Sequence, residues 1–301
     1  MRSRKRNRIR EGNPVVTGIL YLLVILICAV TLYPMYYVLI LSVSAPEIAA
    51  RMDVYWFPKG FSLDAYRMLI GDKEMWRAYL NTILYTVPTT LLMLATSVMI
   101  AYPLTYKRLM GRKYLNLFLL IPMYFSGGMI PAFLLITKLG LYANPLSQII
   151  PACFSIWNII LMKAFFSSIP EGMREAAKID GAGILRILKD VYLPLSKPIL
   201  AVISVYTIVG TWNSWFSALV YLPRTDWQPL QLFLRRILVE STRQVTEILT
   251  PELAAEMMRK QMSGAQLKYA MIIFTTLPIL FTYPFFQKYF VKGVMIGAIK
   301  G

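Results

Sequence analysis

The chain has 301 residues, of which 57% are hydrophobic and 16% are charged, and its formal net charge is +17. A soluble domain of this length could not bury so much apolar side chain, so the composition predicts an integral membrane protein. The positive charge could indicate a nucleic-acid partner, but the basic residues cluster beside apolar runs, as the positive-inside rule describes. We therefore expect membrane lipid, and no nucleic acid, as the surroundings of this chain.

Six runs without Asp, Glu, Lys or Arg follow one another along the chain, and each approaches or exceeds the ~20 residues that span a bilayer as a helix. They predict transmembrane helices at about 15–43, 79–105, 114–136, 145–165, 198–222 and 269–290. The alternation typical of barrel strands is missing, so the predicted fold is all-α, a polytopic bundle of six helices in a single domain, residues 1–301. The first run is too long for a signal peptide and is expected to be retained.

Charge predicts the orientation of these helices. The N-terminal tail, residues 1–13, holds six basic residues, and the gap after the second helix holds Lys107, Arg108, Arg112 and Lys113 without an acid. Placing both on the cytoplasmic side puts residues 166–197 and the C-terminal tail, residues 291–301, there too. Residues 223–268 then form the longest extracytoplasmic loop.

The third predicted helix is interrupted by Ser126-Gly127-Gly128, which precedes Pro131. This pattern indicates a break in the helix or a close helix contact, and the alternative is ordinary kinked packing, because proline and glycine are tolerated in membrane helices where neighbours satisfy the backbone.

The polar stretch 166–197 has helix signals at both ends. Ser168 and Glu171 fit a capping box, and Gly181 and Gly183 are expected to end the helix that begins there. We expect the small residues Ala176 and Ala177 to share a face on which another protein can approach closely. Further apolar residues predict a second helix that packs against the bundle: Ile184, Leu185, Leu188 and Val191.

The long outer loop also contains helical patterns. Leu230, Leu234 and Leu238 recur at helical spacing, and Pro251 could start another helix. This extracytoplasmic cap either receives a partner or roofs the bundle.

Catalytic chemistry is missing from the sequence. It contains no histidine, no phosphate-binding Gly-x-x-x-x-Gly-Lys motif and no ionisable residue deep inside a predicted span. Secondary carriers usually keep carboxylates in their spans, so this absence disfavours that class. We expect a non-catalytic subunit that holds no cofactor or metal of its own.

The residues of the polar stretch resemble a known family. Glu175-Ala176-Ala177, Gly181 and Val191-x-Leu193-Pro194 are similar to the "EAA" cytoplasmic loop of binding-protein-dependent ABC importer permeases. Trp212-Asn213-Ser214-Trp215-Phe216 and the glycine-punctuated tail 292–301 resemble maltose-type and lipoprotein-operon-type permeases of the carbohydrate-uptake branch. The resemblance covers essentially the whole chain.

The resemblance implies a type I importer permease in the bacterial plasma membrane, with both termini in the cytoplasm. The implied partners are a second, homologous permease, two ATPase subunits that bind ATP and Mg, and an extracytoplasmic solute-binding protein. A heterodimer of unlike permeases is expected. We call residues 166–197 the coupling loop, and the residues that the ATPase would grip are Glu171, Glu175, Ala176, Ala177, Asp180 and Gly181.

A sugar path should be polar yet uncharged, because amides and hydroxyls bond sugar hydroxyls and aromatic faces stack on sugar rings. The best candidates lie mainly in the fifth helix, where packing is the alternative role of each residue: Tyr124, Ser204, Tyr206, Thr207, Trp212, Asn213 and Trp215. The arginines of the outer loop hint at an acidic oligosaccharide of the alginate type: Arg224, Arg235, Arg236 and Arg243. The alternatives are the same machine with a non-sugar solute, a secondary carrier or channel, or a membrane scaffold.

Overall fold

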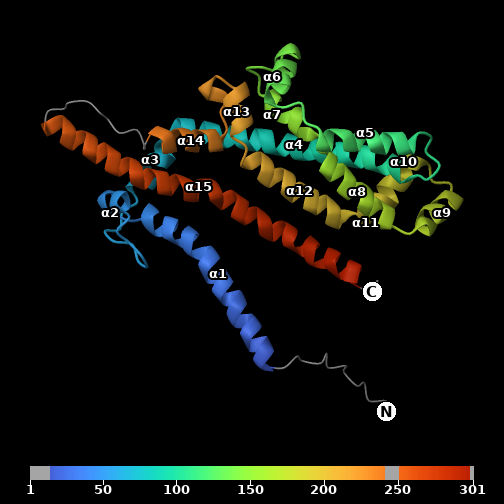
Figure 1. The fold of residues 1–301 in the computed structure, drawn as a ribbon, viewed down its shortest axis with the longest axis horizontal. Coiled ribbons are helices and arrows are strands. Elements are labelled where there is room, and N and C mark those ends of the chain that lie inside the picture. Colours follow the sequence, from blue (N-terminus) through green and yellow to red (C-terminus); the bar gives the residue numbers. More distant parts are fainter. Residues whose placement is uncertain (1–13, 241–250, 299–301) are drawn as a thin grey trace. The chain divides into compact units, whose positions relative to one another are not determined.

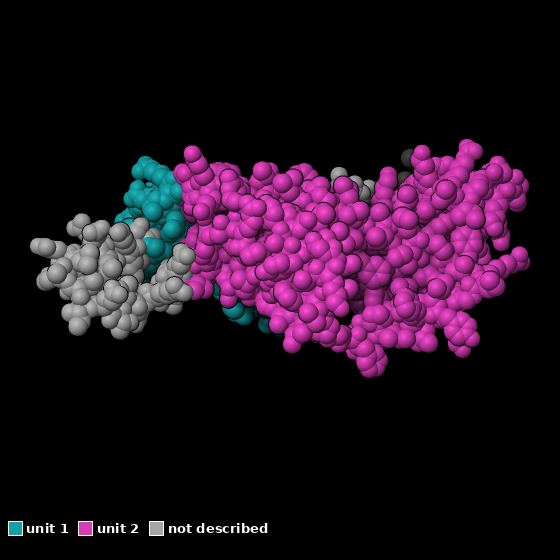
Figure 2. All heavy atoms as spheres, turned by 90° about the horizontal axis from the view of Figure 1, so that it is seen from above, with its two compact units in different colours: residues 1–68, 244–273 teal, residues 69–243, 274–301 magenta. Residues whose placement is uncertain are grey.

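The structure is a computed structural model that describes residues 14–240 and 251–298. Helices dominate this described part, and no strand occurs in it, as the apolar runs predict. The chain divides into two compact units: residues 1–68 with 244–273 form unit 1, and residues 69–243 with 274–301 form unit 2 (Figure 2). The basic tail, Arg243 and residues 299–301 lie outside the described residues.

Unit 1 contains α1 (Pro14–Ser42), α2 (Pro46–Arg51), most of α3 (Asp64–Gly71) and the first part of α15 (Pro251–Ala298). The side chains of residues 15–32 in α1 are exposed, as expected of an apolar helix whose solvent is lipid. The end of α1 contributes to a small buried cluster of Ile40, Leu41, Ala49, Val54 and Tyr269.

Unit 2 begins at Leu69 with the last residues of α3, and α4 (Lys73–Thr105) follows. The Asp72 carboxylate caps α4 by accepting hydrogen bonds from the backbone N–H groups of Glu74 at 2.7 Å and Met75 at 3.3 Å. This cap starts the helix several residues before the predicted boundary at 79, because capping rather than hydropathy decides where a helix begins.

The remaining helices of unit 2 follow α4 in chain order (Figure 1). They are α5 (Arg112–Tyr124), α6 (Met129–Lys138), α7 (Leu146–Ile149), η1 (Pro151–Cys153), α8 (Ile156–Ser168), α9 (Glu171–Ile179), α10 (Ile184–Ile187), the π-helical turn η2 (Leu188–Tyr192), α11 (Leu193–Leu195), α12 (Lys197–Trp212), α13 (Phe216–Tyr221), η3 (Thr225–Trp227) and α14 (Leu230–Glu240). The second part of α15 also belongs to unit 2.

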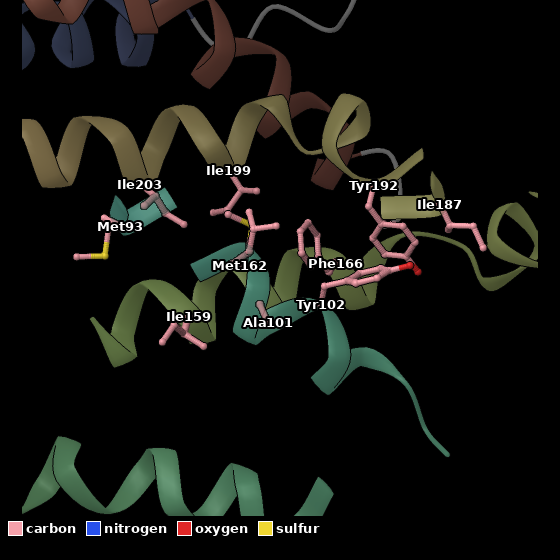
Figure 3. Close-up of a cluster of buried hydrophobic side chains, with 11 residues drawn as sticks. Met93, Ala101, Tyr102, Ile159, Met162, Phe166, Ile187, Tyr192, Ile199 and Ile203 are labelled. Carbon is pink, nitrogen blue, oxygen red and sulfur yellow. The ribbon is translucent and has the colours of Figure 1, made fainter. Parts of the chain in front are cut away.

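The core of unit 2 lies where α4, α8 and α12 meet (Figure 3). Ala101 of α4 is fully buried, and its small side chain allows neighbouring backbones to approach closely. Phe166 of α8 and Tyr192 of η2 pack edge to face at a ring-centroid distance of 5.4 Å. This cluster joins the spanning helices to the coupling loop in one packed body.

Three helices are each long and apolar enough to cross a membrane by themselves: Val15–Ser42, Lys73–Thr105 and Gly264–Gln287. Three bent pairs raise the number to six if each pair is one span: Arg112–Tyr124 with Met129–Lys138, Leu146–Cys153 with Ile156–Ser168, and Ile184–Leu195 with Lys197–Trp212. The structure is consistent with the predicted polytopic bundle.

The third predicted span is broken rather than continuous. The axes of α5 and α6 differ by 114°, and residues 125–128 separate the two helices. Gly128 has φ +84° with ψ −179°, a backbone conformation that only glycine adopts readily. The Ser126-Gly127-Gly128 segment is therefore a break, and the kinked-packing alternative is wrong.

Two further boundaries differ from the prediction. The fifth span does not continue to residue 222, because α12 ends at Trp212 and α13 starts at Phe216. The helix predicted to start at Pro251 runs without interruption into the sixth span, so α15 is one 48-residue helix. Lys163 lies inside α8, where its ammonium donates to the Asn116 side-chain oxygen.

Candidate functional site

The turn that ends α9 is built by its backbone. The N–H of Gly181 donates to the carbonyl of Lys178 at 3.0 Å, and the N–H of Ala182 donates to the carbonyl of Ala177 at 2.9 Å. These two bonds form a Schellman motif, which places Gly181 in the left-handed region with φ +79°. The predicted role of Gly181 as the terminator of this helix is confirmed.

The predicted capping box at the start of α9 is wrong. The Ser168 hydroxyl donates to the carbonyl of Phe165 at 2.7 Å, and Pro170 occupies the N-cap position without a side-chain hydrogen bond. The Glu171 carboxylate instead accepts from the Lys107 ammonium at 3.0 Å and pairs with the Arg174 guanidinium. Two cations outside the capping pattern therefore decide where this carboxylate lies.

The residues predicted to meet the ATPase divide between two faces of the loop. Glu175, Ala176 and Asp180 are exposed, whereas Ala177 packs against the core cluster of unit 2. Glu171 is exposed but carries the two ion pairs already described. The expectation that Ala176 and Ala177 share one outward face is wrong, because adjacent helix positions lie about 100° apart.

Exposed aliphatic side chains flank the Gly181 turn. Ile179 is 86% exposed, Ile184 is 61% exposed and Leu185 is 78% exposed. The expectation that Ile184 and Leu185 pack against the bundle is wrong, because Ile187 and Tyr192 are the buried members of this stretch. Exposed aliphatic groups at a polar loop favour a protein partner at this turn.

A second site is a cavity of about 920 Å³ in unit 2, between α4, α7, α8, α12 and α13. We call it the polar cavity after the hydroxyl and amide groups that recur among its lining residues, although most of the surface that lines it is apolar. Every described residue that lines it is uncharged: Thr82, Tyr85, Met93, Ser147, Gln148, Pro151, Ala152, Ser155, Trp157, Asn158, Val205, Tyr206, Thr207, Val209, Gly210, Thr211, Ser214, Ser217, Tyr221 and Pro229.

Gln148 is the centre of a small hydrogen-bond chain in the polar cavity. Its side-chain oxygen accepts from the Ser217 hydroxyl at 2.7 Å, and its side-chain nitrogen donates to the Ser147 hydroxyl at 3.1 Å. The Ser217 hydroxyl also lies 3.0 Å from that of Ser214. These bonds hold amide and hydroxyl groups from α7, α13 and the α12–α13 connection against one another.

Only part of the predicted substrate path lines the polar cavity. Tyr206 and Thr207 line it, and the Ser204 hydroxyl is turned to the carbonyl of Leu200 at 2.8 Å. Tyr124 is exposed at the end of α5. Sequence reasoning missed Gln148 and Ser217, because they come from separate helices and no motif joins them.

The Trp212–Trp215 group has structural contacts instead. The Trp212 indole donates to the carbonyl of Thr275 at 3.1 Å, and the Asn213 amide donates to the carbonyl of Val209 at 2.9 Å. The Arg235 guanidinium lies 4.5 Å from the centroid of the Trp215 ring. None of these three fifth-span residues belongs to the described lining of the polar cavity.

Comparison with known proteins adds three findings. Residues 80–296 match the family described as binding-protein-dependent transport system inner membrane component. Protein LplC of Bacillus subtilis (strain 168) is 35% identical over 274 residues, which cover 91% of this chain and 90% of the relative. The polygalacturonan/rhamnogalacturonan transport system permease protein YtcP of the same organism is 33% identical over 290 residues, covering 96% and 99%.

A solved structure is also similar over nearly the whole chain. It is a crystal structure of a bacterial ABC transporter involved in the import of the acidic polysaccharide alginate. The matched chain is 32% identical with a TM-score of 0.81, and the match covers 96% of this chain and 99% of that one.

Proposed function

This chain belongs to the family of binding-protein-dependent transport system inner membrane components, and we propose that it admits an oligosaccharide or polysaccharide. It is a permease subunit of an ABC importer and is not itself catalytic, since a separate subunit hydrolyses ATP. The chain is an integral membrane protein that crosses the membrane more than once. Two similar proteins support the carbohydrate class, because one is named for polygalacturonan and rhamnogalacturonan transport and the other is involved in the import of alginate.

The observation that carries the proposal is the uncharged lining of the polar cavity. Amide and hydroxyl groups can replace the hydrogen bonds that sugar hydroxyls make with water. Two aromatic side chains on its edge, Trp157 and Tyr206, are more than half exposed and offer flat faces for sugar rings. We propose that this cavity is the part of the substrate path that this chain supplies.

The charge of the substrate is a separate question from its class. The described arginines of the outer segment are already engaged: Arg224 lies over Trp227, Arg235 lies over Trp215, and Arg236 pairs with Glu74. Since the described cavity lining is uncharged, we propose that this chain recognises sugar hydroxyls and leaves carboxylate recognition to another subunit. The same machine with a non-sugar solute stays the alternative.

The proposed assembly contains this chain, a second and unlike permease, two ATPase subunits and a solute-binding protein outside the membrane. ATP and Mg would bind to the ATPase subunits. The coupling loop would contact an ATPase through its exposed residues Glu175, Ala176 and Asp180, with Ile179 and Leu185 as apolar anchors. Glu171, Ala177 and Gly181 would shape that surface through an ion pair, through packing against the core cluster and through the left-handed turn, respectively.

Import by the reconstituted complex in vesicles tests the substrate class. Uptake of a labelled oligosaccharide should require ATP. Unlabelled galacturonan or alginate oligosaccharides should inhibit this uptake, while a non-sugar osmolyte such as betaine should leave it unchanged. Neutral oligosaccharides delivered at high concentration should compete within the same path. ATP-driven uptake of the osmolyte, with no uptake of any sugar, would contradict the carbohydrate proposal.

Cysteine labelling tests the proposed orientation, with both termini in the cytoplasm. In intact cells, an impermeant reagent should label a single cysteine at position 60 or 240 but not at position 110 or 180. Labelling at position 180 from outside would overturn both the orientation and the ATPase-facing role of the coupling loop. Labelling after membrane permeabilisation is the control for reagent access.

A further inference from the structure

Arg174 has an unusual position for a charged residue of a solvent-facing loop. Its side chain is only 11% exposed, on the inner side of α9, and its guanidinium carbon lies 4.7 Å from the centroid of the Tyr106 ring. Its charge is paired with the Glu171 carboxylate one turn earlier. A largely buried charge needs such partners, so the position of α9 depends on both contacts.

Glu171 extends the contact to another segment. Its carboxylate also accepts a hydrogen bond at 3.0 Å from Lys107, which follows the end of α4. The Lys107 hydrogen bond, with attraction from Arg174, holds the pKa of the Glu171 carboxyl below its ordinary value. The carboxylate therefore stays charged at neutral pH and bridges a cation of α9 to a cation of the α4 end.

The end of α4 contacts the second half of the coupling loop as well. The Tyr102 hydroxyl lies 2.7 Å from that of Tyr106 and donates to the carbonyl of Ile184 at 3.2 Å. Its ring packs edge to face against Tyr192 at 5.0 Å. Figure 3 shows Tyr102 and Tyr192 adjacent at this end of the core. The last turn of α4 is thus joined to α10, and Tyr106 and Lys107, directly after α4, are joined to α9.

The opposite part of α4 lines the polar cavity through Thr82 and Tyr85. Tyr85 and Tyr102 belong to one helix and are separated by roughly 25 Å along its axis at ~1.5 Å per residue. A displacement of α9 can therefore reach the cavity wall through a single helix, provided that α9 is held firmly on the end of α4. Charge-assisted hydrogen bonds are roughly twice as strong as neutral ones, so the bond between Lys107 and Glu171 holds α9 on the end of α4 more firmly than a neutral hydrogen bond would.

We propose that Lys107, Glu171 and Arg174 are positioning residues that fasten α9 to α4 and so transmit ATPase-driven movement to the polar cavity. The proposal rests on the proposed function, because transmission has a meaning only in an ATP-driven importer. It assigns to these residues a role separate from contact with the ATPase. Loss of the fastening should lower the number of sugars imported per ATP hydrolysed while the assembled complex still hydrolyses ATP.

The test uses the full reconstituted complex and compares Lys107→Gln, Glu171→Gln and the double variant. Lys107 and Glu171 are exposed, so neither substitution should prevent folding. Each single variant should lower sugar import per ATP about fivefold or more, and the double variant should be no worse than Glu171→Gln, because that substitution alone already removes both ion pairs. The matched control is Arg186→Gln, which removes an exposed ion pair with Asp190 inside the same loop. It should keep the wild-type ratio.

A covalent bridge between positions 107 and 171 provides the decisive test. In a background with Cys28→Ser and Cys153→Ser, the variant with Lys107→Cys and Glu171→Cys should be uncoupled until a short flexible bis-maleimide joins the two thiols. Restored import per ATP would support the positioning role. Failure of the bridge to restore it, or wild-type ratios in both single Gln variants, would overturn it. If the wild-type complex itself imports no sugar with ATP, the proposed function fails instead.

Discussion

The coupling loop and the polar cavity, both in unit 2, use polar side chains in different ways. Around α9, charges and left-handed backbone define one rigid surface, with Glu171 held between two cations and Gly181 in a Schellman turn. Around Gln148, the described lining is uncharged and its hydroxyl and amide groups bond one another. A surface that transmits force needs a fixed shape, whereas a sugar path needs groups that can exchange partners. Substitutions in each region should therefore fail in different ways.

The largest effect is expected at Gly181. Proline fixes φ near −65°, whereas Gly181 has φ +79° and donates its N–H to Lys178. Gly181→Pro should therefore destabilise the turn by about 3 kcal/mol or more, and uptake should fall to background while membrane insertion persists. Uptake and ATPase activity of the purified complex are the measurements.

Two variants separate backbone conformation from crowding at this turn. A Cβ atom added at either Gly181 or Gly183 would meet open space, but Gly183 has φ −72°. Gly183→Ala should therefore behave like wild type, and Gly181→Asn should retain most activity because asparagine tolerates the left-handed region. Equal loss in Gly183→Ala and Gly181→Pro would show that the conformation of Gly181 is not the reason.

The next effect distinguishes the two alanines of the motif. Ala177→Asp would place a carboxylate against the core cluster, at a cost of several kcal/mol unless the group is neutralised or hydrogen-bonded. Complex yield and Tm should fall. Ala176→Asp adds the same charge at an exposed position. The Tm should therefore not differ measurably from that of the wild type, while the affinity for the ATPase should fall. A lower Tm in Ala176→Asp alone would reverse this assignment of faces.

A smaller effect is expected in the polar cavity. Gln148→Leu removes an acceptor from Ser217 and a group that could bond sugar, which should cost roughly 1 kcal/mol, or about fivefold in uptake per assembled complex. Asn213→Leu is the matched control, since Asn213 donates to the carbonyl of Val209 and is not itself among the described lining residues. It should change complex stability more than uptake. A larger loss of uptake per assembled complex in Asn213→Leu than in Gln148→Leu would instead place Asn213 in the substrate path.

The smallest effect is expected at Arg235, whose guanidinium lies over Trp215. An exposed cation–π contact contributes about 0.5–1 kcal/mol. Arg235→Gln should therefore change uptake less than fivefold, and equally for acidic and neutral oligosaccharides. A selective loss of the uptake of acidic oligosaccharides, measured by competition with neutral ones, would show that Arg235 binds the sugar carboxylate.

Several features could be predicted from the sequence because they are local. A run of about 20 uncharged apolar residues must satisfy its backbone in lipid, and this requirement alone predicts helical spans. The left-handed position of Gly181 also follows from neighbouring residues, since glycine accepts that conformation without cost, whereas the sequence left the segment at Gly128 open between a break and kinked packing. The coupling loop was recognisable for the same reason: its residues are contiguous.

The tertiary structure decided which of those residues face inward and which groups meet. Ala176 and Ala177 look alike in the sequence, but packing against the core assigns them different faces. Glu171 meets Lys107 across 64 positions of the chain, and Gln148 meets Ser217 across 69. No local pattern encodes such pairs, because the relative placement of helices depends on the shape of all the side chains between them.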